Sequence, residues 1–233
     1  MYLNDAKVLV TGGSSGIGRE TARLLVERGA AVAITGRDQQ RLREAADAVG
    51  ATAIPGDVSV EADAVRMVRG VLDAFGDYNV LVNNAGIGAF APLLEVTAEQ
   101  MRRVWEVNVL GATLVARESA RHFVQRNFGN IINVGSTSGL RAGAGGSAYA
   151  STKFALRGLT ESWRAELRGH DIRVMLLNPS EVVTEFAARA GRGQHDDPSK
   201  LRPREIAHAV VSMLTMDDRG FIPELSVWAT NPK

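Results

Sequence analysis

The chain contains 233 residues, of which 45% are hydrophobic and 23% are charged, and this composition excludes a disordered polypeptide. Basic and acidic residues number 27 and 26, so the net charge of +1 gives no electrostatic drive toward nucleic acid or a membrane surface. The absence of cysteine excludes disulfides, thiol nucleophiles and thiolate metal sites.

Short runs rich in β-branched residues alternate with longer helical patterns along the whole chain. The predicted strands cover residues 7–11, 31–35, 52–55, 80–83, 130–134, 172–178 and 225–228. The predicted helices cover residues 16–28, 38–49, 97–126, 149–168 and 203–216, with a further helix that begins at an Asp57 or Ser59 cap and ends near Phe75. Thr97 and Gln100 have the spacing of a capping box at the start of the long helix.

This alternation indicates parallel strands joined by crossover helices, and therefore an α/β, Rossmann-type doubly wound sheet with helices on both faces. No linker, internal repeat or low-complexity segment divides the chain, so we expect a single domain over residues 1–233. Residues 137–147 and 185–202 are rich in glycine or in charge and are expected to be irregular. The second of these stretches is a candidate lid over a substrate.

No targeting or membrane-spanning segment is visible in the sequence. No apolar run reaches about 20 residues, the length that a membrane helix needs. The first residues lack a basic stretch followed by a long apolar run. We therefore expect a cytoplasmic protein with no membrane partner.

A glycine-rich segment follows the first predicted strand and leads into a helix: Thr11-Gly12-Gly13-Ser14-Ser15-Gly16-Ile17-Gly18. Such a unit can bring a phosphate against the amides and the positive dipole end of the helix. Its spacing differs from the G-x-G-x-x-G pattern and partly matches a nucleoside-triphosphate loop. Because Arg19-Glu20 stands where that loop needs Lys-Ser/Thr, we interpret the segment as a dinucleotide-binding loop. A glycine turn without a ligand is the alternative.

Tyr149 and Lys153 are four residues apart at the start of a predicted helix and therefore share one face. An ammonium group within a few ångströms lowers the pKa of a phenol from about 10. A phenol tuned in this way can exchange a proton with a carbonyl or alcohol oxygen near neutral pH. A half-buried ring beside an exposed amine is the ordinary alternative for such a pair.

Four motifs occur in the order and spacing of the short-chain dehydrogenase/reductase family, which the chain resembles over about residues 1 to 230. They are Thr11-Gly-x-x-x-Gly-x-Gly18, Asn83-Asn84-Ala85-Gly86, Ser136 and Tyr149-Ala-Ser-Thr-Lys153. Among members of the family, the chain resembles those that reduce 3-oxoacyl groups on a carrier protein. The resemblance implies a seven-stranded parallel sheet in the order 3-2-1-4-5-6-7.

The resemblance also implies the roles of the site residues. Tyr149 is the expected acid/base, Lys153 its electrostatic tuner and ribose ligand, and Ser136 the donor to the substrate oxygen. Asn108 matches a fourth catalytic member, which holds a water that connects to the lysine. Taken alone, Ser136 would be a turn residue and Asn108 a polar residue inside a helix. The expected cofactor-binding residues are Gly12, Ser14, Ser15, Gly16, Ile17, Gly18, Arg37, Asp57, Val58, Asn84, Ala85, Gly86, Tyr149, Lys153, Pro179, Val183 and Thr184.

The end of the second predicted strand bears on the choice of nicotinamide cofactor. Proteins that bind the unphosphorylated form place an acidic residue there. Here Gly36 occupies the position and Arg37 follows it. A guanidinium attracts a 2′-phosphate through charge-assisted hydrogen bonds, so the sequence predicts NADP(H). A solvated surface arginine is the alternative, and Ser15 stands where a basic residue would strengthen the prediction.

We therefore expect an oxidoreductase that transfers a hydride between NADP(H) and a small carbonyl/alcohol substrate, as a ketone or 3-oxoacyl reductase. An NAD-linked alcohol dehydrogenase and a non-catalytic NADPH-sensing protein are the alternatives. No nucleic acid is expected as a partner. No metal is expected either, because His122, His170, His195 and His208 show no metal-ligand spacing.

A homodimer or homotetramer is expected from the resemblance. The C-terminal segment lacks the Gly-Gly that accompanies tetramer contacts in many family members, which leaves the tetramer in doubt. A dimer formed through the helices at 97–126 and 149–168 is the other arrangement. Apolar side chains available for it are Trp105, Val109, Phe154 and Trp163.

Overall fold

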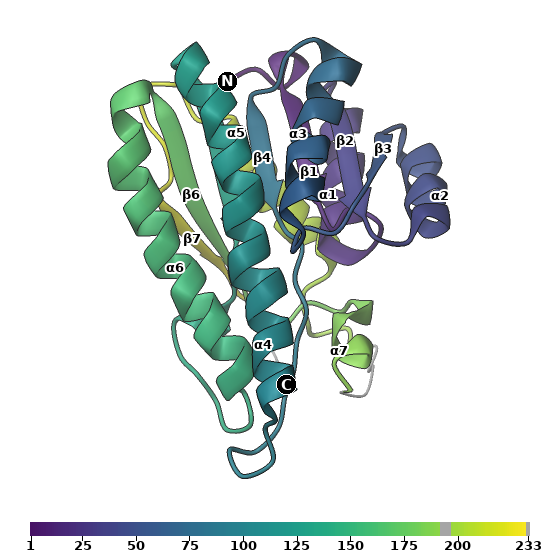
Figure 1. Cartoon of the computed structure of the whole chain (residues 1–233), viewed down its shortest axis with the longest axis vertical. Coiled ribbons are helices and arrows are strands. Elements are labelled where there is room, and N and C mark those ends of the chain that lie inside the picture. Colours follow the sequence, from purple (N-terminus) through teal and green to yellow (C-terminus); the bar gives the residue numbers. More distant parts are fainter. Residues whose placement is uncertain (192–196, 232–233) are drawn as a thin grey trace.

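The computed structural model describes residues 1–191 and 197–231. Its single sheet has seven strands in the order β3-β2-β1-β4-β5-β6-β7, and each neighbouring pair is parallel (Figure 1). The predicted doubly wound architecture and strand order are therefore confirmed. The strands are β1 (Lys7–Thr11), β2 (Ala31–Gly36), β3 (Thr52–Pro55), β4 (Val80–Asn83), β5 (Gly129–Val134), β6 (Ile172–Pro179) and β7 (Glu224–Val227).

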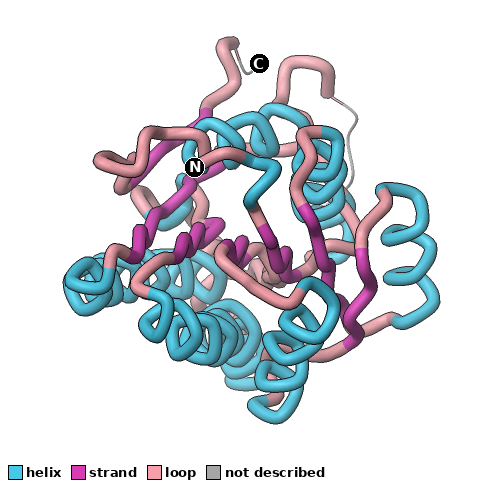
Figure 2. Tube along the Cα trace, turned by 90° about the horizontal axis from the view of Figure 1, so that it is seen from above, coloured by secondary structure: helices cyan, strands magenta, loops and turns pink. Residues whose placement is uncertain are grey.

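Helices cover both faces of the sheet (Figure 2). The alternation of side chains along each strand explains the two layers, since Val8 and Val10 pack on one face and Leu9 packs on the other. In the part of the chain that the structure describes, no helix combines the length and hydrophobicity needed to cross a bilayer. On one face lie α1 (Gly16–Glu27), α2 (Gln39–Val49) and α8 (Pro203–Leu214), and on the other lie α3 (Glu61–Phe75), α5 (Ala112–Arg126) and α6 (Ser147–Leu167).

The prediction of one long helix over residues 97–126 is wrong in one respect, because this segment is not a continuous α-helix. It consists of α4 (Ala98–Trp105), a π-helical segment (Glu106–Gly111) and α5. The predicted capping box at Thr97 and Gln100 is present at the start of α4. A π segment carries one extra residue per turn and rotates the side chains that follow it, and such segments occur often at functional sites.

The stretch predicted to be irregular over residues 185–202 contains a short helix, α7 (Glu185–Arg189). An isolated parallel bridge between Val182 and Leu201 connects the two sides of this stretch. Residues 192–196 lie outside the described residues. They include His195 and part of the predicted lid. The lid stays a prediction. Residues 137–147 contain a single turn of 3₁₀ helix (Thr137–Gly139), and α6 begins at Ser147, two residues before the predicted start.

Candidate active site

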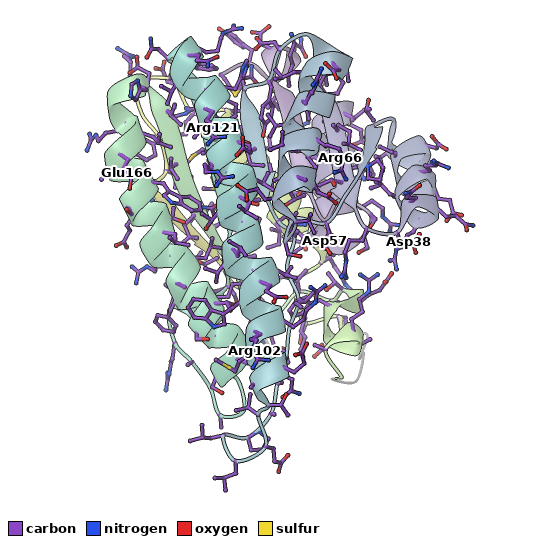
Figure 3. All side chains as sticks on the ribbon, viewed as in Figure 1. Asp38, Asp57, Arg66, Arg102, Arg121 and Glu166 are labelled. Carbon is purple, nitrogen blue, oxygen red and sulfur yellow. The ribbon has the colours of Figure 1, made fainter. Side chains whose placement is uncertain are left out.

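A cleft of about 1200 Å³ opens along the carboxyl ends of the strands, where ligands bind in open α/β sheets. Its walls come from the loop between β1 and α1, from the ends of β2, β4, β5 and β6, and from α7. Figure 3 shows Asp38 and Asp57 on the side of the molecule nearest α7. The predicted site residues that line the cleft are Gly12, Ser14, Ser15, Gly16, Ile17, Arg37, Asp57, Val58, Asn84, Ala85, Gly86, Ser136, Tyr149, Lys153, Pro179, Val183 and Thr184.

The glycine-rich loop has the geometry of an anion cradle. Gly12 and Gly16 have φ angles of +65° and +53°, a region that side chains disfavour. A Cβ atom on Gly12 would stand 2.9 Å from the Cα of Ala85. Ser15 is the N-cap of α1, yet its side chain makes no capping hydrogen bond. The first amides of α1 are therefore available to a phosphate, and these residues fit a dinucleotide.

Gly18 and Asn84 hold this loop in place. Gly18 does not line the cleft, and a Cβ atom there would overlap the carbonyl oxygen of Gly12 and approach Asn84 Nδ2 to 2.5 Å. The Asn84 amide donates to the carbonyl oxygens of Thr11 (2.9 Å) and Gly12 (3.2 Å). The Thr11 hydroxyl accepts from the backbone amides of Asn84 and Ala85, both at 2.9 Å. The end of β4 thus supports the loop that follows β1.

Ser136, Tyr149 and Lys153 meet on the opposite wall of the cleft. Ser136 follows β5, and its hydroxyl accepts a hydrogen bond from the amide of Ser138 at 3.1 Å. Tyr149 lies in the first turn of α6, and Lys153 lies one turn later. The ammonium nitrogen of Lys153 is 5.6 Å from the centre of the Tyr149 ring and donates to the carbonyl oxygen of Val134 at 2.8 Å. The two side chains share a helix face, as the sequence predicts.

The pKa of Tyr149 differs from the sequence-based expectation. Burial raises the pKa of this phenol to about 12, although the hydrogen bond with Ser136 lowers it. The expected decrease caused by Lys153 is therefore wrong for the protein as it stands. The reason is the desolvation of the buried phenol; Lys153 is buried as well, and burial lowers the pKa of its ammonium to about 8. Desolvation outweighs the attraction between the two groups.

Asn108 lies behind the wall of the cleft, in the π-helical segment. Its side-chain amide pairs with the backbone of Ile87, accepting from its N–H at 2.8 Å and donating to its carbonyl oxygen at 2.9 Å. It also donates to Thr152 at 3.1 Å. A Cβ atom on Gly86 would lie 3.3 Å from Asn108 Oδ1 and 3.8 Å from Lys153 Nζ. Asn108 thus joins the loop after β4 to α6, and the water that we expect it to hold stays a prediction.

Arg37 and Asp57 form the end of the cleft near β2 and β3. The Arg37 guanidinium, with 58% of its side chain exposed, is 3.7 Å from the Asp57 carboxylate. Although burial raises the pKa of Asp57, hydrogen bonds from Ser59 and the charges of Arg37 and Arg103 bring it below its ordinary value. Asp57 is therefore ionised at neutral pH and orients Arg37 beside the cleft.

Five charged residues that line the α7 side of the cleft are absent from the predicted site residues. Glu185, on α7, accepts from Arg41 of α2 at 2.6 and 2.8 Å and from Arg189 at 2.7 Å. Glu181 is paired with Lys200 at 2.6 Å. The bridge between Arg41 and Glu185 joins residues that lie 144 positions apart, so no local sequence signal could have indicated it.

Phe90 and Phe186 are further cleft residues that the sequence did not single out. Phe90 follows β4 and Phe186 lies on α7. Each ring centre lies 5.4 Å from the ring centre of Tyr149. A phenylalanine in a loop and another in a charged stretch carry no distinguishing pattern, so only the fold could bring them together.

The chain is similar to known oxidoreductases. A family model described as short chain dehydrogenase matches residues 6–195. YxnA, an uncharacterized oxidoreductase of Bacillus subtilis, is 34% identical over 222 residues, which make up 90% of this chain and 62% of that protein. The chain therefore spans less than two thirds of the length of YxnA. SERP2049, an uncharacterized oxidoreductase of Staphylococcus epidermidis, is 31% identical over 227 residues, 97% of each chain.

Solved structures resemble the whole fold. The closed form of a serine dehydrogenase complexed with NADP⁺ has a TM-score of 0.91 and 30% identity, covering 97% of this chain and 96% of that one. The 3-ketoacyl-(acyl-carrier-protein) reductase of Brucella melitensis, complexed with NADH, has a TM-score of 0.88 and 30% identity, covering 96% of each chain.

Proposed function

Because the chain belongs to the short-chain dehydrogenase family, we propose that it is an NADP(H)-dependent reductase that converts a carbonyl group into an alcohol. The observation that carries this proposal is the position of Ser136, Tyr149 and Lys153 across one cleft from the glycine-rich loop. A dinucleotide lying along that loop would extend toward the phenol.

Each of these residues has a chemical role in the proposal. The Ser136 hydroxyl donates to the carbonyl oxygen of the substrate and holds it beside Tyr149. Tyr149, protonated at neutral pH, gives its proton to that oxygen. Lys153 supplies positive charge near the developing phenolate, and Asn108 fixes the loop on which Gly86 lies. A nicotinamide bound in the cleft would supply a hydride to the carbonyl carbon; with the proton from Tyr149, the C=O double bond would become a C–O single bond and one new C–H and one new O–H bond would form.

Two observations support the phosphorylated cofactor. Arg37 and Arg41 line the end of the cleft where the adenosine would lie, and a guanidinium binds a phosphate well. A similar structure contains NADP⁺. Another contains NADH, which favours the NAD-linked alternative. The substrate in this proposal is a ketone or a 3-oxoacyl thioester, the latter suggested by the Brucella relative.

The experiment that tests the proposal follows the absorbance of NADPH and of NADH at saturating concentrations of a carbonyl panel. We expect oxidation of NADPH with at least one ketone, at a kcat/KM more than about tenfold above that with NADH, given the strength of charge-assisted bonds to a phosphate. Faster turnover with NADH would support the NAD-linked alternative. Tight binding of NADPH without turnover of any compound would support a sensing protein.

The proposal includes a homo-oligomer. Trp105, Leu110 and Phe154 are 38%, 47% and 43% exposed, although they are large apolar residues. They lie on α4, on the π segment and on α6, and the Trp105 indole donates to Ser151 of α6 at 3.3 Å. We propose that these three residues belong to one apolar face, which a second copy of the chain would cover.

A further inference from the structure

The rings of Phe90 and Phe186 flank Tyr149 inside the cleft. Both ring centres lie 5.4 Å from that of Tyr149, and the planes are tilted by 46° and 57°. Tilted arrangements at this distance are favourable contacts between aromatic rings. The three rings come from the loop after β4, from α6 and from α7, so the fold assembles an aromatic wall at the proposed acid.

Gly88 makes this assembly possible. A Cβ atom there would lie 2.8 Å from Phe90 and 2.9 Å from Phe186, closer than side-chain carbons approach each other. The same atom would lie 3.1 Å from the Cβ of Ala190. The loop after β4 can therefore pass between Phe90 and α7 only without a side chain at residue 88, and the rings stay directed at the cleft.

The charges on this side of the cleft already have partners. Among the described residues, both carboxylates of the 181–191 stretch are paired: Glu181 with Lys200, and Glu185 with Arg41 and Arg189. The polar groups closest in the chain to Ser136 are the uncharged hydroxyls of Thr137 and Ser138, which also line the cleft. An ionised substituent on a substrate would have to replace the partner of like charge in one of these ion pairs, and this exchange carries a cost in desolvation.

Arginines of α5 are also paired with carboxylates. Arg117 pairs with Glu61 and at 2.8 Å with Glu118, and Arg121 pairs with Glu118 at 2.9 Å. Arg126 lies 3.0 Å from Asp77. Because carboxylates of the same chain neutralise these arginines, α5 offers little attraction to an acidic carrier protein. These side chains therefore do not favour a carrier-bound substrate.

We propose that the substrate is an uncharged ketone that carries an aromatic ring, and that Phe90 and Phe186 bind that ring beside Tyr149. This inference rests on the proposed function, because it places the carbonyl oxygen at Ser136 and Tyr149. Two aromatic contacts would supply binding free energy for that ring. Among the described residues of the α7 side, Glu181 is paired with Lys200 and Glu185 with Arg41 and Arg189, and this pairing selects against ionised substrates.

The test compares acetophenone with butanone, which lacks the ring, and with 4-acetylbenzoate, which adds a carboxylate to it. We expect kcat/KM for acetophenone to exceed that for each of the others by about tenfold or more, since one apolar group in a pocket is worth about 10- to 200-fold. Phe90→Leu and Phe186→Leu keep apolar bulk and remove the ring. Each should lower the acetophenone value several-fold more than the butanone value, because only acetophenone carries a ring for the lost aromatic contact.

Phe75→Leu, at the end of α3 and outside the cleft, is the matched control and should change neither value. Binding of acetophenone to the protein saturated with NADP⁺, measured by calorimetry, reports the ring site without turnover. Ring-dependent binding without turnover of any ketone would overturn the proposed function and keep the ring site. Reduction of butanone or 4-acetylbenzoate as efficiently as acetophenone would overturn the ring site and keep the proposed function.

Discussion

Tyr149 is the residue on which the proposed chemistry depends. Burial raises the pKa of its hydroxyl, which Ser136 lowers, and its ring packs between two phenylalanines. Tyr149→Phe removes one oxygen and keeps these ring contacts, so the fold and the affinity for NADPH should stay near those of the unmodified protein. We expect turnover to fall by at least about 100-fold, the usual contribution of a general acid.

Steady-state kinetics and fluorescence titration with NADPH measure the two effects of Tyr149→Phe separately. Tyr78→Phe is the control, because Tyr78 is buried beside Ser119 and does not line the cleft. A Tyr149→Phe protein that retains full activity would remove this residue from the mechanism.

The pKa of Lys153 predicts how kcat/KM for ketone reduction falls at alkaline pH, which is the alkaline limb of the pH profile. Reduction needs a protonated Tyr149 and a charged Lys153 in the proposed mechanism. Because burial lowers the pKa of Lys153 to about 8, its charge is present below that pH and is lost as the pH rises. Tyr149 keeps its proton up to a much higher pH, since its pKa is raised to about 12. We therefore expect kcat/KM for ketone reduction to decline above about pH 8.

A series from pH 6 to 10 with NADPH measures this limb. Lys153→Met should give a low rate without that limb, and its folding should be intact because it replaces a buried amine by a side chain of similar length. An unchanged rate up to pH 10 in the unmodified protein would show that Lys153 does not titrate in the working enzyme.

Arg37 carries the prediction of cofactor choice. It lines the cleft, with Asp57 on one side at 3.7 Å. Arg37→Asp would place a second carboxylate beside Asp57 and repel a 2′-phosphate. We expect the preference between NADPH and NADH to shift by more than about tenfold toward NADH, because each lost charge-assisted bond is worth roughly 1.5–3 kcal/mol.

The ratio of kcat/KM values with the two cofactors measures the Arg37 effect. Arg43→Asp is the matched control, since Arg43 lies on the exposed side of α2 and outside the cleft. An equal shift in that variant would mean that net charge, and not contact with the phosphate, sets the preference.

At the level of elements, a buried arginine connects the sheet to the end of α8. Arg173 of β6 donates to Asn130 of β5 at 2.6 Å and to the carbonyl oxygens of Leu214, Met216 and Gly220 at 3.2–3.3 Å. These carbonyls lie at or beyond the C-terminus of α8, where helices leave oxygens without partners. The guanidinium thus fixes how α8 ends against the sheet.

Arg173→Met should lower the free energy of unfolding by about 2–4 kcal/mol, because the buried oxygens of Asn130 and Leu214 and the part-buried carbonyls of Met216 and Gly220 lose a charged donor. Urea denaturation measures the change. Arg168→Met, at an exposed position after α6, should change stability by less than about 0.5 kcal/mol. Equal stability of the two variants would show that α8 needs no such anchor.

The elements also show where sequence periodicity stops being informative. The alternation of strands and helices predicted the sheet because hydrophobic spacing is a local property. The interruption at residues 106–111 contains Asn108, whose amide pairs with Ile87, 21 residues earlier. A pattern of apolar residues read along one helix contains no information about that partner, so the π segment could not be predicted.

At the level of the whole molecule, the motifs of the site were visible in the sequence because each is compact. Tyr149 and Lys153 share a helix turn, and the glycines share one loop. The residues that shape the rest of the cleft are far apart in sequence: Phe90, Phe186 and the pair formed by Arg41 and Glu185. Only the folded sheet brings them to one edge, and the substrate preference proposed above rests on Phe90 and Phe186.

The last prediction concerns assembly. A self-complementary interface of standard size buries about 800 Å² on each subunit, and a cluster of exposed apolar side chains is its usual centre. Trp105, Leu110 and Phe154 are exposed apolar side chains of this kind, and the proposed dimer would bury them. We expect light scattering after gel filtration to give at least twice the mass of one chain.

Leu110→Glu combined with Phe154→Glu should convert this assembly into monomers, because two buried charges on each side of a twofold interface are strongly unfavourable. Leu94→Glu is the control, since Leu94 is an exposed apolar residue (97%) in the loop before α4 and not on this face. If Leu94→Glu gives monomers and the double variant does not, the chains associate through that loop, and the helical face is free.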